Sequence, residues 1–289
     1  MKVSGFTFIR NAITLDYPVV ESIQSILPLC DEVVVAVGNS EDQTLELIQN
    51  IDPKVKVIQT IWDDTLRANG AVLALETDKA LAAIDPEADW AFYIQGDEVL
   101  HEADHAAIRS AMEQYQNDQE VDGLLFDYLH FYGSYDYIGV SNNWYKKEIR
   151  IIKPRRGIYS FRDAQGFRKA PDQKLKVALA NAKVHHYGWV KDPQAMQRKQ
   201  ERFHRLWHDD AWLEKNVKVA TSFDYEDHIH ELARFEGTHP QWIAERIAAR
   251  NWTFQTDIAR NKKTLKNRLK DLLKAIGIDT NYANYTRIR

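Results

Sequence analysis

The feature that most constrains the fold is a regular alternation of short apolar runs with helical patterns in the first half of the chain. The apolar runs that predict strands are residues 3–9, 33–37, 55–58 and 91–94. The segments that carry apolar residues at helical spacing are 18–27, 45–48 and 66–84. Strands that alternate with helices form right-handed crossovers, so we expect an α/β fold with a mostly parallel central sheet flanked by helices.

The pattern changes in the second half of the chain. Strands are predicted at 123–128 and 148–152, and a further apolar run leads into the sequence HHYGW. From Pro193 onward the chain shows helical patterns with interleaved aromatic and charged residues. A chain of 289 residues can hold one large α/β domain with a helical appendix. We therefore expect one domain over residues 1–200 and a helical carboxy-terminal extension over 201–289, packed on that domain.

Composition and charge narrow the class of protein. The formal net charge is −4, so no overall basic field attracts nucleic acid. The single cysteine, Cys30, excludes an internal disulfide framework and fits a reducing compartment. The amino terminus lacks the apolar core of a signal peptide, and no apolar run reaches the roughly 18 to 20 residues that span a bilayer. We expect a cytoplasmic protein that does not cross a membrane.

Two adjacent carboxylates, Asp97 and Glu98, follow the strand predicted at 91–94. In open α/β sheets, ligands bind beyond the carboxyl ends of the strands, which is where these side chains are expected. Mg²⁺ and Mn²⁺ prefer oxygen ligands from one or two carboxylates together with phosphate oxygens. A metal site is the functional interpretation, and a solvated acidic loop is the alternative. As a loop carboxylate, Asp97 is expected to contribute little to the stability of the fold.

Histidines supply further candidates for a metal site. His185 and His186 are neighbours in a predicted strand, so at most one of them faces a common site. One imidazole beside the carboxylates would favour Mn²⁺ over Mg²⁺, and a hydrogen-bonded structural histidine is the alternative. His204 and His208 also have a spacing that can bind metal on a helix. Their flanking residues do not form the HExxH motif, which favours a solvated helix face.

Asp42 lies in the loop GNSEDQT between a predicted strand and the next helix. Its carboxylate can cap that helix by accepting hydrogen bonds from backbone N–H groups. A carboxylate at the end of a strand can also accept hydrogen bonds from a ribose or from the edge of a base. The sequence does not separate these two roles, and both remain open.

Four segments together resemble family 2 glycosyltransferases of the GT-A fold, and most closely the bacterial enzymes of the lipopolysaccharide core and the cell wall. The segments are FIRNA, DEVVVAVGNSEDQT, DWAFYIQGDEVLHE and HHYGWV. The similarity extends over roughly residues 3–200. It implies a Rossmann-like GT-A sheet, a nucleotide-sugar donor of the UDP type, and Mn²⁺ or Mg²⁺ as cofactor.

The resemblance also implies roles for individual residues. The exit of the first strand would lie under the uracil and the ribose, and the segment around Arg67 would run beside the donor. The donor-binding residues implied in this way are Arg10, Asn11, Asp42, Arg67, Asn69 and Lys199. The metal ligands implied are Asp97, Glu98 and one histidine, with His186 preferred over His185. Because Gln95 stands where the D-x-D motif has its first acidic residue, Glu98 would bind metal, bind the sugar or brace the loop.

The resemblance implies an inverting reaction in which a carboxylate removes the proton of the acceptor hydroxyl. Asp163, in the sequence SFRDAQGFR, lies about where related enzymes present this base, and Glu102 and Glu148 are the alternatives. The cation would stabilise the charge that grows on the leaving diphosphate. The acceptor implied is a saccharide or a glycolipid.

Two other functions are compatible with the same residues. The first is a nucleotide-sugar-binding protein without turnover, because the acidic motif is displaced. The second is a nucleotidyltransferase, which also places acidic metal ligands on a doubly wound sheet. Such enzymes carry a glycine-rich loop after the first strand, whereas the sequence here is FIRNAITLDYP, without glycine.

The carboxy-terminal extension carries a basic segment at 260–274, RNKKTLKNRLKDLLK, with leucines at helical spacing. It either lies on an anionic membrane surface, which would suit a glycolipid acceptor, or packs its leucines on the main domain. Aromatic residues of the extension either form acceptor subsites or are buried. These residues are Trp207, Trp212, Trp242 and Trp252.

Overall fold

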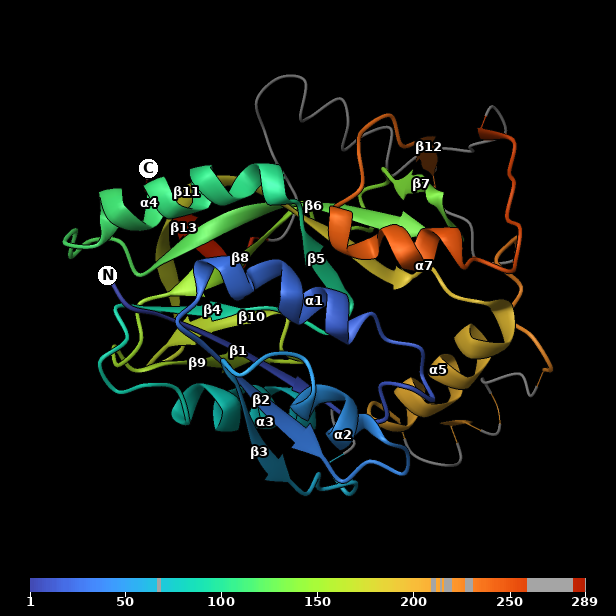
Figure 1. The fold of residues 1–289 in the computed structure, drawn as a ribbon, viewed down its shortest axis with the longest axis horizontal. Coiled ribbons are helices and arrows are strands. Elements are labelled where there is room, and N and C mark those ends of the chain that lie inside the picture. Colours follow the sequence, from blue (N-terminus) through green and yellow to red (C-terminus); the bar gives the residue numbers. More distant parts are fainter. Residues whose placement is uncertain are drawn as a thin grey trace.

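In a computed structural model of the protein, the amino-terminal strands form the expected parallel sheet (Figure 1). The structure describes residues 1–66, 69–208, 212–213, 215, 220–226, 231–258 and 283–288. The amino-terminal strands are β1 (Val3–Ile9), β2 (Glu32–Gly38), β3 (Val55–Thr60) and β4 (Trp90–Tyr93). They lie in the order β3-β2-β1-β4, and each neighbouring pair is parallel, which confirms the predicted α/β class.

The second half of the chain extends this sheet with strands of both directions. These strands are β5 (Glu98–Leu100), β6 (Gly123–Tyr132), β7 (Ser134–Gly139), β8 (Lys147–Ile152), β9 (Ile158–Phe161), β10 (Gly166–Lys169) and β11 (Gln173–Trp189). β8 lies between β4 and β6 and is antiparallel to both. β11 is parallel to β6, and β5 pairs with β11 in the antiparallel direction. The sheet as a whole is therefore mixed.

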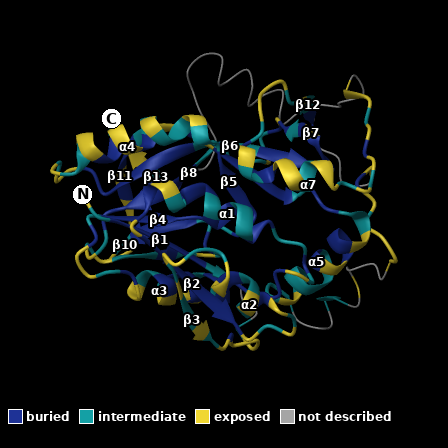
Figure 2. Cartoon of the chain, in the orientation of Figure 1, coloured by how far each residue is buried: buried dark blue, intermediate teal, exposed yellow. Residues whose placement is uncertain are grey.

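Helices cover both faces of the parallel half. They are α1 (Val19–Ile26), α2 (Thr44–Gln49), α3 (Ala71–Ala82) and α4 (His105–Tyr115). α1 and α4 pack with Val33 and Val35 of β2 in one hydrophobic cluster, whereas α3 packs with Val34 and Ala36 in another. Successive residues of β2 thus face opposite layers, and the strand is buried on both sides, as its apolar sequence predicts (Figure 2).

Two element boundaries differ from the sequence pattern for local reasons. The helix expected over 66–84 begins at Ala71, because Asn69 and Gly70 have φ angles of 54° and 68°, which an α-helix does not allow. The strand β5 has only three residues and was not predicted. Its partner β11 is remote in the sequence, and three residues are too few to show a period.

The described part of the region after residue 200 packs on the main sheet. Its elements include the end of α5 (Pro193–Arg205), the strands β12 (Leu232–Arg234) and β13 (Tyr285–Arg287), and α7 (Ala244–Ala248). β12 pairs with β7 and β13 pairs with β11. The described residues also include the 3-10 helices η1 (Leu27–Leu29), η2 (Glu102–Asp104) and η4 (Gln241–Ile243).

Two expectations about the carboxy-terminal region stay predictions. The basic segment at 260–274 lies outside the described residues, and so does any helix it forms. The boundary between domains at residue 200 also stays a prediction. In the portion of the chain that the structure describes, no helix is both long and apolar enough to cross a membrane.

Candidate active site

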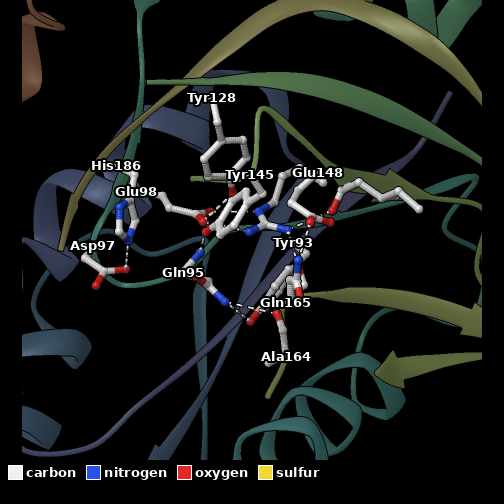
Figure 3. A network of polar contacts seen from close by, with 12 residues as sticks. Tyr93, Gln95, Asp97, Glu98, Tyr128, Tyr145, Glu148, Ala164, Gln165 and His186 are labelled. Atoms are coloured by element: carbon white, nitrogen blue, oxygen red, sulfur yellow. Dashed lines mark hydrogen bonds and ion pairs between the residues drawn. The ribbon is translucent and has the colours of Figure 1, made fainter. Parts of the chain in front are cut away.

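The carboxyl ends of β1, β2 and β4 meet at one edge of the sheet, and Asp97 lies in the turn that follows β4. β5 then runs against β11 and brings Glu98 opposite His186. α5 follows β11 and places Lys199 against Asp97. Three segments that are remote in the sequence therefore form one site, part of which Figure 3 shows.

Asp97 is a buried, ionised carboxylate. Its residue surface is 8% exposed, and Oδ2 accepts a hydrogen bond from Lys199 Nζ at 3.1 Å. Burial by itself raises the pKa of Asp97, but nearby positive charges, with Lys199 first among them, hold this pKa well below its usual value. The sequence expectation that Asp97 contributes little to stability assumed a solvated loop carboxylate; in the structure Asp97 is buried and paired, and its loss would leave Lys199 as an uncompensated buried charge.

A hydrogen-bonded chain orients His186 toward Asp97. Nε2 of His130 lies 2.9 Å from the carbonyl oxygen of Tyr145, which can only accept, so this nitrogen carries the proton. Burial lowers the pKa of His130 well below its usual value, so the ring is neutral and its Nδ1 is an acceptor. Nδ1 of His186, 3.2 Å away, must then be the donor. The remaining lone pair of His186, on Nε2, lies 3.7 Å from Asp97 Oδ1.

Gly188 allows these two side chains to approach the backbone of β11 closely. A Cβ atom at this position would lie 2.7 Å from both Asp97 Oδ2 and His186 Nε2. A carboxylate oxygen and an imidazole nitrogen fit Mn²⁺ or Mg²⁺, with phosphate oxygens and water as the remaining ligands. Within the described ranges, no group of three His, Cys, Asp or Glu side chains could hold a metal. A cation at Asp97 and His186 would therefore take its remaining ligands from water or from a bound molecule.

Glu98 is held in a separate buried ion pair. Arg150 donates to it from Nε at 2.8 Å and from Nη2 at 2.7 Å, and the hydroxyl of Tyr128 donates to the same carboxylate (Figure 3). The backbone N–H of Gln95 adds a bond of 3.1 Å. The guanidinium of Arg150 also lies 5.2 Å from the centres of the Tyr93 and Tyr128 rings. Three roles were expected for Glu98: binding metal, binding the sugar or stabilising the loop. These contacts support the stabilising role, and metal binding by Glu98 stays an untested prediction.

His185 lies on the opposite face of β11 from His186. Its ring stacks against Phe131, with centroids 5.8 Å apart, and meets Phe235 edge-on at 6.0 Å. Burial lowers the pKa of His185 to about 3, so the ring is neutral. The structure therefore does not bring His185 to Asp97, because adjacent residues of a strand point to opposite faces.

The predicted donor-binding residues Asn11 and Asp42 join the loops after β1 and β2. Asn11 Oδ1 accepts from the backbone N–H of Glu41 at 2.7 Å. The Asp42 carboxylate accepts from the N–H groups of Thr14 at 2.8 Å and Thr44 at 3.1 Å. Asp42 thus accepts a hydrogen bond from the first residue of α2, which is a structural role. Contact of Asn11 or Asp42 with a nucleotide stays a prediction.

Arg10 crosses the same edge of the sheet. Its Nη1 pairs with Asp64 at 2.6 Å, its Nε donates to the carbonyl oxygen of Asn39 at 3.2 Å, and its guanidinium lies 5.6 Å from the centre of the Trp62 ring. Asn69 is exposed in the turn before α3. Arg67 lies outside the described residues, so its contact with a donor stays a prediction.

The three candidate bases have different surroundings. Glu102 accepts from the N–H of Gln241 at 3.0 Å and holds η4 in place. Asp163 is half-buried in the turn between β9 and β10, and burial raises its pKa. Glu148 accepts from Gln165 Nε2 at 2.7 Å, its Oε2 has no hydrogen-bond partner among the described residues, and burial raises its pKa to about 7.

Gln95 connects the Asp97 loop to the turn that carries Asp163. Its Nε2 donates to the carbonyl oxygen of Ala164 at 3.0 Å (Figure 3). Trp207 borders the same turn: a Cβ atom on Gly70 would lie 2.8 Å from Asp163 Cβ and 3.1 Å from Trp207 Cζ2. Of the tryptophans considered as acceptor subsites, Trp207 thus lies beside the predicted base.

The other candidates in the extension pack elsewhere. Trp242 and Trp252 belong to the hydrophobic cluster around Phe131. Trp212 stacks on His208 with ring centroids 3.5 Å apart, and the ring of His204 lies 5.9 Å from that of His208. Both histidines are half-buried beside Trp212, so they do not lie on the fully solvated helix face that the sequence favoured.

Several important residues were not found from the sequence. Arg150 lies in the strand predicted at 148–152 and His130 lies beyond the strand predicted at 123–128, and nothing in the sequence marks their distant partners. Lys191 and Tyr17 lie in loops, where the structure brings the Lys191 ammonium within 4.7 Å of the Tyr17 ring centre. The sequence signal that was available was Gly188 in HHYGW, since a glycine within a strand marks a close approach of another group.

A depression of about 300 Å³ lies at the opposite edge of the sheet and is lined by Lys2, Asp31, Glu32, Pro53, Lys54, Lys56 and Asp85. Four of its charged side chains are already paired, Lys2 with Asp85 and Lys56 with Glu32. Ligands of parallel sheets bind at the carboxyl ends of the strands, so we do not regard this depression as the active site.

No family model and no curated protein matches the chain. Among solved structures, S. aureus TarS in complex with UDP has a TM-score of 0.40 and 16% identity, covering 76% of this chain and 68% of that one. Glucosyl-3-phosphoglycerate synthase from Mycobacterium tuberculosis, in complex with Mn²⁺, UDP and glucosyl-3-phosphoglycerate, has a TM-score of 0.31 and 17% identity, covering 46% and 45%.

A third structure, 4-diphosphocytidyl-2C-methyl-D-erythritol synthase from Anaerococcus prevotii, has a TM-score of 0.38 and 12% identity, covering 66% of this chain and 91% of that one. In a further structure of TarS, the match spans 41% of the TarS chain. At this degree of similarity, the activity of the chain has to be argued from its own site.

Proposed function

We propose that the protein is a glycosyltransferase that moves a sugar from a nucleotide-sugar, of the UDP type, to a saccharide or glycolipid acceptor. The observation that carries the proposal is the pair of Asp97 Oδ1 and His186 Nε2, 3.7 Å apart at the carboxyl ends of parallel strands. Two metal-binding atoms that leave the remaining ligand positions to water or to a bound molecule suit a donor that brings its own diphosphate. The resemblance of the four sequence segments supports the same function.

In this proposal, the residues at the strand ends bind the donor. Asp97 and His186 hold Mn²⁺ or Mg²⁺, which when bound offsets the negative charge that grows on the departing diphosphate. Lys199 adds a fixed positive charge beside Asp97. The loop with Arg10 and Asn11 lies under the nucleoside.

Asp163 is the base of the proposed reaction, which inverts the anomeric carbon in one displacement. The acceptor oxygen attacks that carbon, the bond to the diphosphate breaks, and the hydroxyl proton passes to the Asp163 carboxylate. Burial raises the pKa of Asp163 and so makes its carboxylate a stronger base. We place this activity in the cytoplasm, at the inner face of the membrane where the acceptor is a glycolipid.

The first experiment is the melting temperature of the pure protein with UDP, with and without Mn²⁺. A ligand that binds only the folded state raises this temperature by mass action. We expect UDP to stabilise the protein only when Mn²⁺ is present. The Asp97→Asn variant, which keeps the size of the side chain, should lose this response. If no nucleotide diphosphate changes the melting temperature with or without metal, the proposal is wrong.

Turnover separates the proposal from its two alternatives. A panel of UDP-sugars with saccharide acceptors should release UDP. Binding without UDP release under every condition would favour a nucleotide-sugar-binding protein. Release of pyrophosphate from a nucleoside triphosphate and a sugar phosphate would identify a nucleotidyltransferase instead.

A further inference from the structure

Lys191, between β11 and α5, is a buried lysine without a carboxylate of its own. Its residue surface is 0% exposed. Its ammonium group donates to the carbonyl oxygen of Asp16 and lies 4.7 Å from the centre of the Tyr17 ring. Among the residues that the structure describes, no carboxylate forms an ion pair with it. Fully buried lysines are normally paired, so this arrangement requires an explanation.

The nearby carboxylates are bound to other cations. Asp16 pairs with Arg246 at 2.6 Å, and Arg246 also binds Glu21 at 2.6 Å. Asp97 accepts from Lys199. An additional anion at this place would therefore be the first direct anionic partner of Lys191.

The charge of Lys191 is sensitive to its surroundings. Burial and then the positive charge of Lys199 lower the pKa of Lys191 to about 7. Arg246 lowers it further, whereas Asp16 and Asp97 raise it. The other polar group in contact, the hydroxyl of Tyr225, donates to the carbonyl oxygen of Lys191 and not to its ammonium.

Tyr17 connects Lys191 to the candidate diphosphate site. The ammonium of Lys199 lies 5.0 Å from the centre of the same Tyr17 ring and 3.1 Å from Asp97 Oδ2. The charge of Lys191 also reaches this site, because it contributes to the low pKa of Asp97. In a buried environment of low dielectric constant, one charge affects another strongly over a few ångströms. A diphosphate beside Asp97 would thus act on both lysines.

We propose that Lys191 and Lys199 form a two-lysine anion site in which Lys199 contacts the diphosphate of the donor and Lys191 takes up a proton when that diphosphate binds. The proton passes from solvent to Lys191 Nζ, and no covalent bond between heavy atoms changes. Lys191 is a positioning residue: once charged, it binds the Tyr17 ring and the Asp16 carbonyl more strongly and holds the loop after β1 in place. The identity of the ligand rests on the proposed function.

Proton uptake can be measured by isothermal titration calorimetry of UDP with Mn²⁺ in buffers of different ionisation enthalpy. At about pH 7.5, we expect the wild-type protein to take up roughly half a proton more per UDP than Lys191→Arg, since arginine stays charged. Lys191→Met should also lose the uptake and should bind UDP more weakly. Asp97 is already ionised in the folded protein, so metal binding at its carboxylate releases no proton that would mask the difference.

Lys153 provides a matched control. Its ammonium donates to the carbonyl oxygen of Asp118 at 2.6 Å and lies 5.1 Å from the centre of the Trp90 ring, so it has the same kinds of contact at the other edge of the sheet. Lys153→Met should lose about as much stability as Lys191→Met. It should leave the proton uptake on UDP binding unchanged.

Inorganic pyrophosphate with Mn²⁺ distinguishes this inference from the proposed function. If UDP binds with the same proton uptake in the wild type and in Lys191→Arg, the inference is wrong and the proposed function stands. If UDP does not bind but pyrophosphate binds with uptake that depends on Lys191, the two-lysine site stands and the donor assignment fails. If neither ligand binds, both are wrong.

Discussion

Asp97 Oδ1 and His186 Nε2 lie 3.7 Å apart; burial lowers the pKa of His186, and in the neutral ring the hydrogen-bonded chain behind it places the proton on Nδ1, so Nε2 carries a lone pair. An anionic oxygen and a nitrogen lone pair in this arrangement have no attraction for each other without a cation. His130 determines the arrangement, because its Nδ1 accepts the hydrogen bond that fixes the tautomer of His186.

We therefore expect His130→Phe to weaken Mn²⁺ binding in the presence of UDP by roughly 10- to 100-fold, the usual effect of losing a partner of a metal ligand. Calorimetry of Mn²⁺ into the protein with UDP measures this change. His185→Phe is the matched control, since His185 is equally buried but lies on the other face of β11. Unchanged Mn²⁺ affinity in His130→Phe would show that His186 does not bind the metal through Nε2.

Asp97→Ala should destabilise the fold by about 3 kcal/mol or more, because it leaves the ammonium of Lys199 buried without its carboxylate. Urea denaturation measures the free energy of unfolding. The double variant Asp97→Ala/Lys199→Met removes both charges and should recover most of this loss while UDP release stays absent. If the single and double variants are equally unstable, the Asp97–Lys199 pair does not determine the loss.

Gly188→Ala should abolish metal-dependent UDP binding and also lower the melting temperature of the unliganded protein, because the shift of Asp97 weakens its pair with Lys199. The added methyl group would lie 2.7 Å from Asp97 Oδ2 and from His186 Nε2, so both side chains must move out of place. Thermal shift with UDP and Mn²⁺ is the measurement. A normal response to the two ligands would place the donor site elsewhere.

Glu148→Gln should change the pH dependence of stability. The ordinary pKa of a glutamate side chain is 4.5, and burial raises the pKa of Glu148 to about 7 in the folded protein. Between these values the folded state binds more protons than the unfolded state, so stability falls as pH rises from about 4.5 through about 7, by up to about 3 kcal/mol. The amide in Glu148→Gln cannot titrate, so the variant should not show this decrease in stability between about pH 4.5 and about pH 7.

The difference in unfolding free energy between Glu148→Gln and the wild type, measured in urea from about pH 5 to about pH 8, isolates this effect. The amide of the variant can still accept from Gln165, and its NH₂ group lies where Oε2 has no hydrogen-bond partner in the described part of the chain. A constant difference across the pH range would show that Glu148 does not titrate with a raised pKa.

Asp163→Asn should leave the affinity for UDP unchanged and slow transfer by roughly 10²- to 10⁴-fold, the usual contribution of a general base. Calorimetry with UDP and an assay of UDP release test the two parts separately. Glu102→Gln, at a carboxylate engaged with η4, is the control that should transfer normally. Normal turnover in Asp163→Asn would assign the base to another residue.

Local pattern was sufficient to predict the parallel half of the fold. The run VVVAV is apolar at every position, which only a strand covered on both faces requires, and the structure packs its alternate residues into two different clusters. The position of Asp97 followed from the same pattern, because a carboxylate directly after a buried strand must lie at the edge where parallel strands end.

The partners of the site residues were decided only by the tertiary structure. Asp97 and Glu98 are neighbours in sequence, yet Asp97 faces Lys199 and His186 while Glu98 is bound by Arg150. The cause is that β5 begins at Glu98 and pairs with β11, whereas Asp97 lies in the turn before this strand, where its carbonyl oxygen accepts from the N–H of Tyr187 at 2.8 Å. Sequence spacing determines which residues share a strand. Whether a site residue is buried, whether it is ionised, and whether it binds a ligand or supports the loop depend on the remote segments that pack against it.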